Sequence, residues 1–356
     1  MDKSPGNGTE ISAYGEFGLI EHLTKGFPVM NRDTKKGIGD DAAVISPRNR
    51  QMVVTTDLLL EGVHFDLAYT PLKHLGYKAV VVNLSDVYAM NAEPRQITVS
   101  VGVSSRFRVE HLEQLYEGIR LACDHYGVDL IGGDTSASYS GMVISITALG
   151  RAVREELVYR DGAGENDVIC VSGDLGAAYM GLQILKRENK LFQEDPQIQP
   201  DLSRYEYIVG RQLKPEARRD ILTLLKEKGV KPTAMIDISD GLSSDLLHIC
   251  HNSKKGCRIY QDKIPVDAET AATAEEMHIE PLIAALSGGE DYELLFTVSA
   301  KDMDKLAGIP QITAIGFITP QEENRILVTS SGAETAITAQ GWNAFGSAKD
   351  DARSPK

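Results

Sequence analysis

Short apolar runs rich in β-branched residues alternate with helical segments along most of the chain, and this alternation is what most limits the possible folds. Strands are predicted at 53–56, 97–103, 129–131, 141–151, 168–172, 234–238 and 292–298, and helices at 73–92, 109–126, 177–190, 216–229 and 240–251. Strands that alternate with helices are typical of layered folds in which helices cover a sheet. The sequence therefore predicts an α/β (α+β) protein.

The length of 356 residues predicts two domains, because single hydrophobic cores stop growing near roughly 250–300 residues. A charged, glycine-containing stretch at 151–166 is the predicted boundary, and the polar stretch 191–214 reads as a loop or insertion. The predicted divisions are a flexible tail at 1–13, an N-terminal domain at 14–152, a C-terminal domain at 153–345 and a flexible tail at 346–356.

Charge and hydropathy narrow the classes of partner. Lys plus Arg number 37 against 51 Asp plus Glu, a net charge of −14, which argues against a nucleic-acid partner. No apolar run reaches the roughly 18–20 residues that span a bilayer, and the first residues lack a secretory pattern, so we expect no membrane partner and a cytoplasmic protein. The four cysteines show no paired spacing, which predicts reduced thiols.

Acidic residues recur beside glycines and at predicted strand ends, whereas the phosphate-binding motifs GxxxxGK[ST] and GxGxxG are absent. The six clusters are Gly37-Ile38-Gly39-Asp40-Asp41, Thr55-Thr56-Asp57, Asn83-Leu84-Ser85-Asp86, Gly132-Gly133-Asp134-Thr135, Asp237-Ile238-Ser239-Asp240-Gly241 and Gly288-Gly289-Glu290-Asp291. Such oxygen ligands suit Mg²⁺, which is commonly held by a few carboxylates together with substrate phosphates. The pattern thus favours a phosphoryl-transfer site built on magnesium.

Each cluster taken alone also fits a turn or a helix cap. Asp86 fits that interpretation poorly, because it stands among apolar residues of a predicted helix, where an ionised carboxylate needs a cation. Asp237 has no capping role to fill, whereas Asp240 or Ser239 could cap the helix that follows. A zinc site built from His248, Cys250 and their neighbours is disfavoured by its spacing.

Seven motifs, taken in order, resemble those of the thiamine-monophosphate kinase family. They are GEFGLI at 15–20, GIGDDAAV at 37–44, TTDLLLEGVHF at 55–65, VNLSDVYAM at 82–90, LIGGDT at 130–135, IDISDGLSSDL at 236–246 and SGGEDYELLF at 287–296. The resemblance covers about residues 14–345. That family belongs to the aminoimidazole ribonucleotide synthetase superfamily, whose members bind ATP without a P-loop.

The resemblance implies a two-domain aminoimidazole ribonucleotide synthetase-like fold, with N-terminal domains that pair into a β-barrel across a homodimer. It implies direct transfer of a phosphoryl group from ATP to thiamine monophosphate, with several Mg²⁺ ions as cofactors. The implied metal ligands are Asp41, Thr55, Thr56, Asp57, Asp86, Asp134, Asp237 and Asp240. The implied ATP contacts are Gly133, Asp134, Arg160 and Ser239, the implied thiamine phosphate contacts are His64, Glu290 and Trp342, and the residues expected at the chemical step are Asp237 and Asp240.

Several of these assignments have a plain structural alternative. His64 could be structural, Arg160 could be an ordinary solvated arginine, and Trp342 could close the core of the second domain rather than stack on a cationic ring. Two other functions stay open at this point. One is a different ATP-dependent enzyme of the same superfamily, and the other is a non-catalytic protein that binds divalent metal or nucleotide.

Overall fold

The structure is a computed structural model that describes residues 9, 19, 22–36, 44–46, 50–197, 199–320 and 324–339. No helix in these ranges combines the length and the apolar character that crossing a membrane requires. The chain divides into two compact units. Unit 1 contains residues 1–159, 184–204 and 213–231, and unit 2 contains residues 160–183, 205–212 and 232–356.

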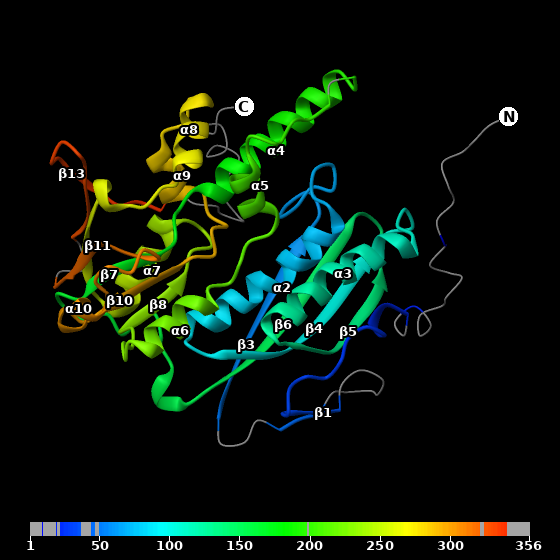
Figure 1. The fold of residues 1–356 in the computed structure, drawn as a ribbon, viewed down its shortest axis with the longest axis horizontal. Coiled ribbons are helices and arrows are strands. Elements are labelled where there is room, and N and C mark those ends of the chain that lie inside the picture. Colours follow the sequence, from blue (N-terminus) through cyan, green and yellow to red (C-terminus); the bar gives the residue numbers. More distant parts are fainter. Residues whose placement is uncertain are drawn as a thin grey trace. The chain divides into compact units, whose positions relative to one another are not determined.

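Unit 1 is built on a four-stranded sheet with the order β3-β6-β4-β5 (Figure 1). Its described elements are β1 (Thr34–Lys36), β2 (Val44–Ile45), β3 (Gln51–Leu60), α2 (Leu72–Ala89), β4 (Glu93–Val103), α3 (Val109–Tyr126), β5 (Asp129–Ala137), β6 (Met142–Ala152) and α6 (Arg219–Glu227). Only β4 and β5 run parallel, and α3 connects them, as a βαβ unit requires. The strands β3 and β5 form the two edges, and the described residues contain no closed barrel.

The helices α2 and α3 cover one face of this sheet (Figure 1). From Leu75 to Ala89 every residue of α2 except Asp86 is buried, which explains its nearly continuous apolar sequence. The opposite face is open on β3, where exposed and half-buried residues alternate along the strand. Consequently Thr55 and Asp57 face α2, whereas Val54 and Leu58 are exposed.

Two predicted strands end later than the sequence suggested. The strand β3 continues past Asp57 to Leu60, and β5 continues past Gly133 and Asp134 to Ala137. Pairing with neighbours explains both extensions, because Asp57 pairs with Ile146 of β6 and Asp134 pairs with Ser100 of β4. These aspartates therefore lie within strands and not in turns after them.

Two glycines let α2 and α3 approach each other closely. A Cβ atom at Gly76 would lie 2.0 Å from the carbonyl oxygen of Leu115, and one at Gly118 would lie 1.9 Å from that of Lys73. Both distances are far below van der Waals contact, so each helix backbone rests directly on the other. The contact fixes the position of the helix that carries Asp86.

Unit 2 is built on a seven-stranded mixed sheet with the order β13-β12-β9-β11-β7-β10-β8. Its strands are β7 (Val168–Ser172), β8 (Ala234–Asp237), β9 (Gly256–Tyr260), β10 (Leu294–Val298), β11 (Ile312–Thr319), β12 (Arg325–Val328) and β13 (Glu334–Ala336). Its helices are α5 (Glu206–Leu213), α7 (Leu242–Ser253), α8 (Ala268–Glu276), α9 (Pro281–Ser287) and α10 (Met303–Leu306), and α4 (Ala177–Glu194) begins in this unit. The strands β7 and β10, and β8 at the edge, are almost wholly buried, which matches their apolar sequences.

Two predictions for this region are wrong. The stretch 191–214 is not simply a loop, because α4 extends to Glu194 and α5 occupies Glu206–Leu213. The signal was weak because α5 has only eight residues and several polar side chains among them. The helix α7 has Gly241 and not Ser239 or Asp240 at its N-cap, and no side chain caps it there.

The close contact of α2 and α3 predicts that Gly118→Ala lowers the melting temperature, because the new methyl group collides with a backbone carbonyl. The expected loss of stability is about 2 kcal/mol, typical of overpacking. Gly210→Ala is the matched control, since its Cβ would meet nothing within 4 Å and the glycine lies inside α5. The control should gain about 0.5–1 kcal/mol. Equal melting temperatures for the two variants in calorimetry would contradict this account of the packing.

Candidate active site

A pair of carboxylates lies between β3 and α2 in unit 1. The hydroxyl of Thr55 donates a hydrogen bond to Oδ2 of Asp86 at 2.6 Å. The backbone N–H of Asp57 donates to Oδ1 of Asn83 at 3.1 Å, and the amide of Asn83 in turn donates to the carbonyl of Ala79. The strand and the helix are thus joined by side chains of the TTD and NLSD motifs.

The two carboxylates of this pair repel each other. Burial, and after it the negative charge of Asp86, raise the pKa of the Asp57 carboxyl to about 6. Asp86 is half-buried and accepts the Thr55 hydroxyl. Two acidic groups held together in a half-buried place create a local excess of negative charge.

Two other predicted ligands of unit 1, Thr56 and Asp134, lie elsewhere on the sheet. Thr56 points to the open face and bonds to the carbonyl of Ile146, so its side chain is not beside Asp86. Asp134 is exposed on β5, and Gly133 before it lies so close to β4 that a Cβ would be 1.8 Å from the carbonyl oxygen of Val99. Since β3 and β5 are opposite edges, the structure separates Asp134 from Asp57 by three strand spacings, ~14 Å.

The ring of His64 has a defined tautomer. Its Nδ1 atom lies 3.0 Å from the backbone nitrogen of Leu60, which can only donate. Nδ1 must therefore accept, and in the neutral ring Nε2 carries the proton. The short turn after β3 thus presents a hydrogen-bond donor near the end of that strand.

A second acidic set lies at the turn between β8 and α7 in unit 2. Asp237 ends β8 and is buried, and Asp240 is half-buried in the turn. Oδ2 of Asp245, one turn into α7, accepts the backbone N–H groups of Ser239 at 3.1 Å and Asp240 at 3.2 Å. Asp245 therefore does not cap the first turn of α7 but holds the preceding turn against the start of the helix.

Electrostatic repulsion is again strong in this set. Burial, followed by the charges of Asp237 and Asp240, raises the pKa of the Asp245 carboxyl to about 8. Burial also raises the pKa of Asp240, and the side chains of His248 and Arg160 oppose that rise. Arg160, a predicted nucleotide contact, thus lies close enough to Asp240 for its positive charge to favour the ionised carboxylate.

The glycine-rich turn of the SGGED motif packs directly on the turn that contains Asp240. A Cβ at Gly289 would lie 2.6 Å from the carbonyl oxygen of Ser239, and the N–H of Glu290 donates to that same oxygen at 2.8 Å. The N–H of Tyr292 donates to the carbonyl of Ile238 at 2.9 Å. Unit 2 therefore brings together Ser239 and Asp240 with Glu290.

Both sets suit magnesium in their chemistry. All the atoms that could bind a metal are carboxylate or hydroxyl oxygens. The raised pKa of Asp57 and of Asp245 reflects burial first and neighbouring negative charge second, and a bound cation would neutralise that charge. Within the part of the chain that the structure describes, no group of three or more His, Cys, Asp or Glu side chains is arranged to hold a metal ion. Two carboxylates with substrate phosphates are a common Mg²⁺ environment, so each set fits an ion shared with substrate.

Some predicted site residues lie outside the described residues. They are Asp41 with its GIGDD motif and Trp342. The GEFGLI motif is described only at Leu19, which is buried.

Sequence reasoning missed several residues that shape unit 2. Asp245 was part of a quoted motif but received no role, although a carboxylate among the leucines of α7 is a recognisable signal. Arg211 and Gln212 had no signal at all, because they act through contacts with residues about 80 positions further along the chain.

Comparison with known proteins gives consistent matches along the chain. The family model for the AIR synthase related protein, N-terminal domain, matches residues 39–152, and that for the C-terminal domain matches residues 164–329. The thiamine-monophosphate kinase of Bacillus subtilis (strain 168) is 30% identical over 337 residues, covering 93% of this chain and 99% of the relative.

Solved structures agree with these matches. The crystal structure of thiamine-monophosphate kinase from Stenotrophomonas maltophilia K279a has a TM-score of 0.75 and 32% identity, covering 90% of this chain and 98% of that chain. The structure of AaThiL complexed with AMPPCP and TMP has a TM-score of 0.72 and 30% identity, covering 96% of this chain and all of that chain, 100%.

The position of Asp245 predicts opposite effects for two substitutions in metal-free buffer. Asp245→Asn keeps an oxygen for the N–H groups of Ser239 and Asp240 but removes the charge that faces Asp237, so the melting temperature should be maintained or raised. Asp245→Ala removes the acceptor and should cost about 1–3 kcal/mol.

The Asp245 carboxyl also makes this difference in melting temperature depend on pH. Its pKa rises from 3.8 to about 8 on folding, so the folded protein holds this proton more tightly and loses stability as the pH rises through that window. Asp245→Asn lacks this loss of stability. Its melting temperature should therefore exceed that of the wild type by a growing amount from pH 5 to pH 8. Thermal melting in EDTA measures it, and a constant difference would refute the predicted charge repulsion.

Proposed function

Because the chain belongs to the AIR synthase related proteins and, among them, to the thiamine-monophosphate kinase family, we propose that it transfers the γ-phosphoryl group of ATP to thiamine monophosphate. The products are ADP and thiamine diphosphate. The two-domain α/β fold with mixed sheets agrees with this family, as the sequence motifs predicted. A relative binds AMPPCP and TMP together, which supports an ATP-dependent enzyme with thiamine monophosphate as acceptor.

One observation in this chain carries the proposal furthest. The turn with Asp237, Ser239 and Asp240 and the turn with Glu290 pack backbone against backbone in unit 2. The first turn is proposed to bind the ATP phosphates. The second turn is proposed to bind thiamine monophosphate. Their direct contact would place donor and acceptor side by side, which direct transfer requires.

The acidic residues are proposed as magnesium ligands. Asp57 and Asp86, with the hydroxyl of Thr55, would hold one ion, and Asp237 and Asp240 would hold another. The other proposed ligands are Asp41, Thr56 and Asp134. When bound, Mg²⁺ neutralises the charge of the ATP phosphates and of the transferred group.

The remaining polar groups are proposed to bind and orient the two substrates. Arg160 and Ser239 are proposed to contact the ATP phosphates. Gly133 and Asp134 are the other proposed ATP contacts. His64, with its proton on Nε2, would donate to a phosphate oxygen. Glu290 and Trp342 would bind the thiamine moiety, whose ring is cationic.

The chemical step needs little from the protein beyond positioning. A phosphate monoester is largely ionised near neutral pH, so its oxygen can attack the γ-phosphorus without a general base. A new P–O bond forms to the thiamine phosphate while the bond between the γ-phosphorus and the β–γ bridging oxygen breaks, and ADP leaves. Asp237 and Asp240 are proposed to hold the Mg²⁺ that would supply positive charge at the transferred group.

The open face of the four-stranded sheet supports a homodimer in which two such sheets pair into a barrel. Val54 and Leu58 of β3 are 60% and 52% exposed, and Met52 beside them is 37% exposed. A strip of large apolar side chains along a strand is typical of a surface that is covered in the assembled protein. The proposed dimerisation domain is 14–152, followed by a C-terminal domain at 153–345.

Asp240→Asn is predicted to lower kcat by about 100-fold or more, because it removes charge stabilisation at the transferred group. Thiamine diphosphate is measured by mass after incubation with ATP, magnesium and thiamine monophosphate. Asp304→Asn, at an exposed carboxylate of α10, is the matched control and should retain activity. Near-normal turnover in Asp240→Asn would show that this residue has no essential part in the mechanism. Absence of product with the wild type would refute the proposed function.

Leu58→Glu is predicted to shift the protein from dimer to monomer, since it places a charge within the proposed interface. Ile283→Glu is the matched control, because Ile283 is similarly exposed at 55% but lies in unit 2. Sedimentation velocity measures the mass of both variants and of the wild type. A wild type that sediments as a monomer, or a variant that stays dimeric, would contradict the proposed pairing of sheets.

A further inference from the structure

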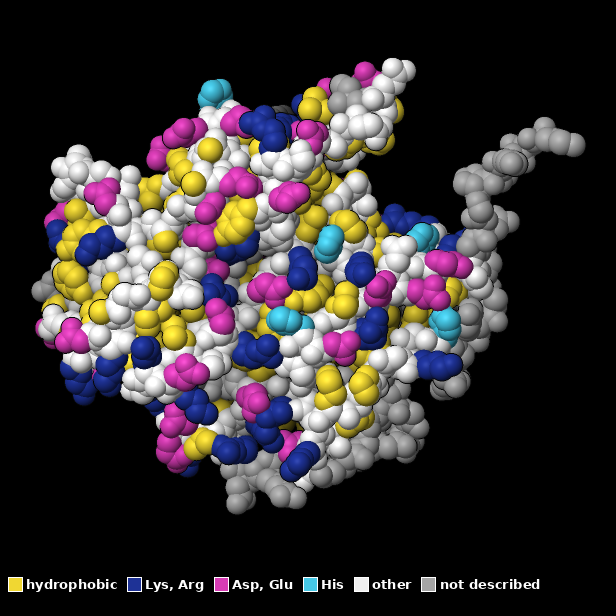
Figure 2. Space-filling view, viewed as in Figure 1, with side chains coloured by type: hydrophobic (Ala, Val, Ile, Leu, Met, Phe, Trp, Pro, Cys, Tyr) yellow, Lys and Arg dark blue, Asp and Glu magenta, His cyan; other side chains and the backbone are white. Residues whose placement is uncertain are grey.

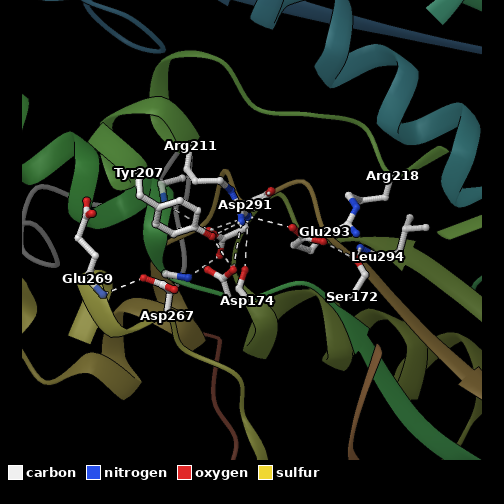
Figure 3. A network of polar contacts seen from close by, with 12 residues as sticks. Ser172, Asp174, Tyr207, Arg211, Arg218, Asp267, Glu269, Asp291, Glu293 and Leu294 are labelled. Carbon is white, nitrogen blue, oxygen red and sulfur yellow. Dashed lines mark hydrogen bonds and ion pairs between the residues drawn. The ribbon is translucent and has the colours of Figure 1, made fainter. Parts of the chain in front are cut away.

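The short helix α5 lies outside every motif of the sequence, yet three of its side chains point into the polar network of unit 2. Figure 3 shows Tyr207 and Arg211 meeting Asp174 and Asp291. Gln212, the next residue along the helix, contacts Glu290. These contacts connect α5 to the turn at residues 289–292, here called the Glu290 turn.

The Glu290 turn has a strained backbone. Gly289, Glu290 and Tyr292 have φ angles of 70°, 59° and 52°, and two of the three are not glycine. Each non-glycine residue in this left-handed region costs of order 1 kcal/mol and persists only where surrounding contacts hold it. The contacts that hold this turn therefore decide where the Glu290 side chain points.

The buried carboxylate of Asp291 supports the Glu290 turn. Its side chain is completely buried, and Oδ2 accepts the N–H of Gly176 at 2.8 Å while Oδ1 lies 3.4 Å from the N–H of Ala178. These donors belong to the first turn of α4 and its approach, where backbone N–H groups have no partner within the helix. The carboxylate thus ties the Glu290 turn to the start of α4.

Arg211 fixes the same turn from the side of α5. Its Nη2 atom donates to the backbone carbonyl of Asp291 at 3.2 Å and to that of Asp174 at 3.3 Å, and lies 3.1 Å from a carboxylate oxygen of Glu293. One guanidinium group therefore bonds the backbone of the turn and offsets the buried negative charge around it. Its Nη1 atom bonds the hydroxyl of Tyr207 at 3.0 Å, which orients the group along the helix.

Gln212 acts on the Glu290 side chain itself. Its Nε2 atom donates to Oε2 of Glu290 at 2.9 Å, and the glutamine is buried, with 6% exposure. A buried donor with a fixed position restricts the rotation of the carboxylate that receives it. Ordering a long side chain such as that of Glu290 costs rotamer entropy, and this hydrogen bond helps to offset that cost.

We propose that Arg211 and Gln212 of α5 are positioning residues for the acceptor site, Arg211 holding the Glu290 turn and Gln212 orienting the Glu290 carboxylate. Neither residue needs to touch a substrate for this role. The inference rests on the proposed function, in which Glu290 contacts thiamine monophosphate. It assigns a role to a helix that carries no family motif.

Gln212→Leu tests the orientation of Glu290, because leucine fills similar space without donating a hydrogen bond. The expected result is a rise in KM for thiamine monophosphate of about tenfold, with kcat and KM for ATP within about twofold, since a binding contact is weakened equally in ground and transition states. Val209→Ala is the matched control, because Val209 is buried on the same helix, and it should lower the melting temperature without changing KM. Equal KM values for Gln212→Leu and the wild type would overturn the role of Gln212.

Arg211→Lys tests the hold on the turn while keeping the charge. A lysine ammonium has a single nitrogen, so it cannot keep the contacts of Nη2 with Asp174, Asp291 and Glu293 together with the bond from Nη1 to Tyr207. Amide hydrogen exchange should therefore accelerate at least tenfold in a peptide covering 287–293 and stay unchanged in one covering 168–172. Unchanged exchange at 287–293 would overturn the role of Arg211. This readout needs no substrate, so a wild type without kinase activity would refute the proposed function while the exchange result still judges the positioning.

Discussion

Carboxylates that lie close together in buried or half-buried surroundings are the constraint on which the rest of this protein depends. Asp57 faces Asp86 in unit 1, and Asp245 faces Asp237 and Asp240 in unit 2. Such groups destabilise the fold unless a cation or a proton neutralises them, and stable proteins keep them chiefly where function needs them. The apolar packing around them must therefore supply stability that the acidic sets remove.

Much of that packing consists of backbone in direct contact with backbone. Gly76 and Gly118 bring α2 against α3, which fixes the helix that carries Asp86. Gly289 brings the Glu290 turn against Ser239 in the same manner. Contacts of this kind tolerate no added methyl group, so they position the acidic side chains more strictly than side-chain packing alone would. Positioning of that strictness is what phosphoryl transfer needs from a protein.

The acidic turns also depend on partners that are distant in the sequence. Arg211 reaches the backbone of Asp291, and Asp291 reaches the first turn of α4. A strained turn supported from two helices keeps its shape because each support removes a different direction of movement. In this arrangement, residues that no substrate touches determine how precisely the turn is positioned, which is common in active sites.

The sequence by itself determined the α/β class, most strands and helices and the acidic motifs, because hydrophobic periodicity and glycine placement are local signals. It could not determine where β3 and β5 end, since pairing with β6 and β4 carries these strands past Asp57 and Asp134. Only the tertiary structure decided that Thr55 and not Thr56 bonds Asp86, and that Asp245, Arg211 and Gln212 support the turns of unit 2. These are contacts between residues far apart in the chain or between opposite faces of one strand, and their geometry exists only once the sheets and helices have packed.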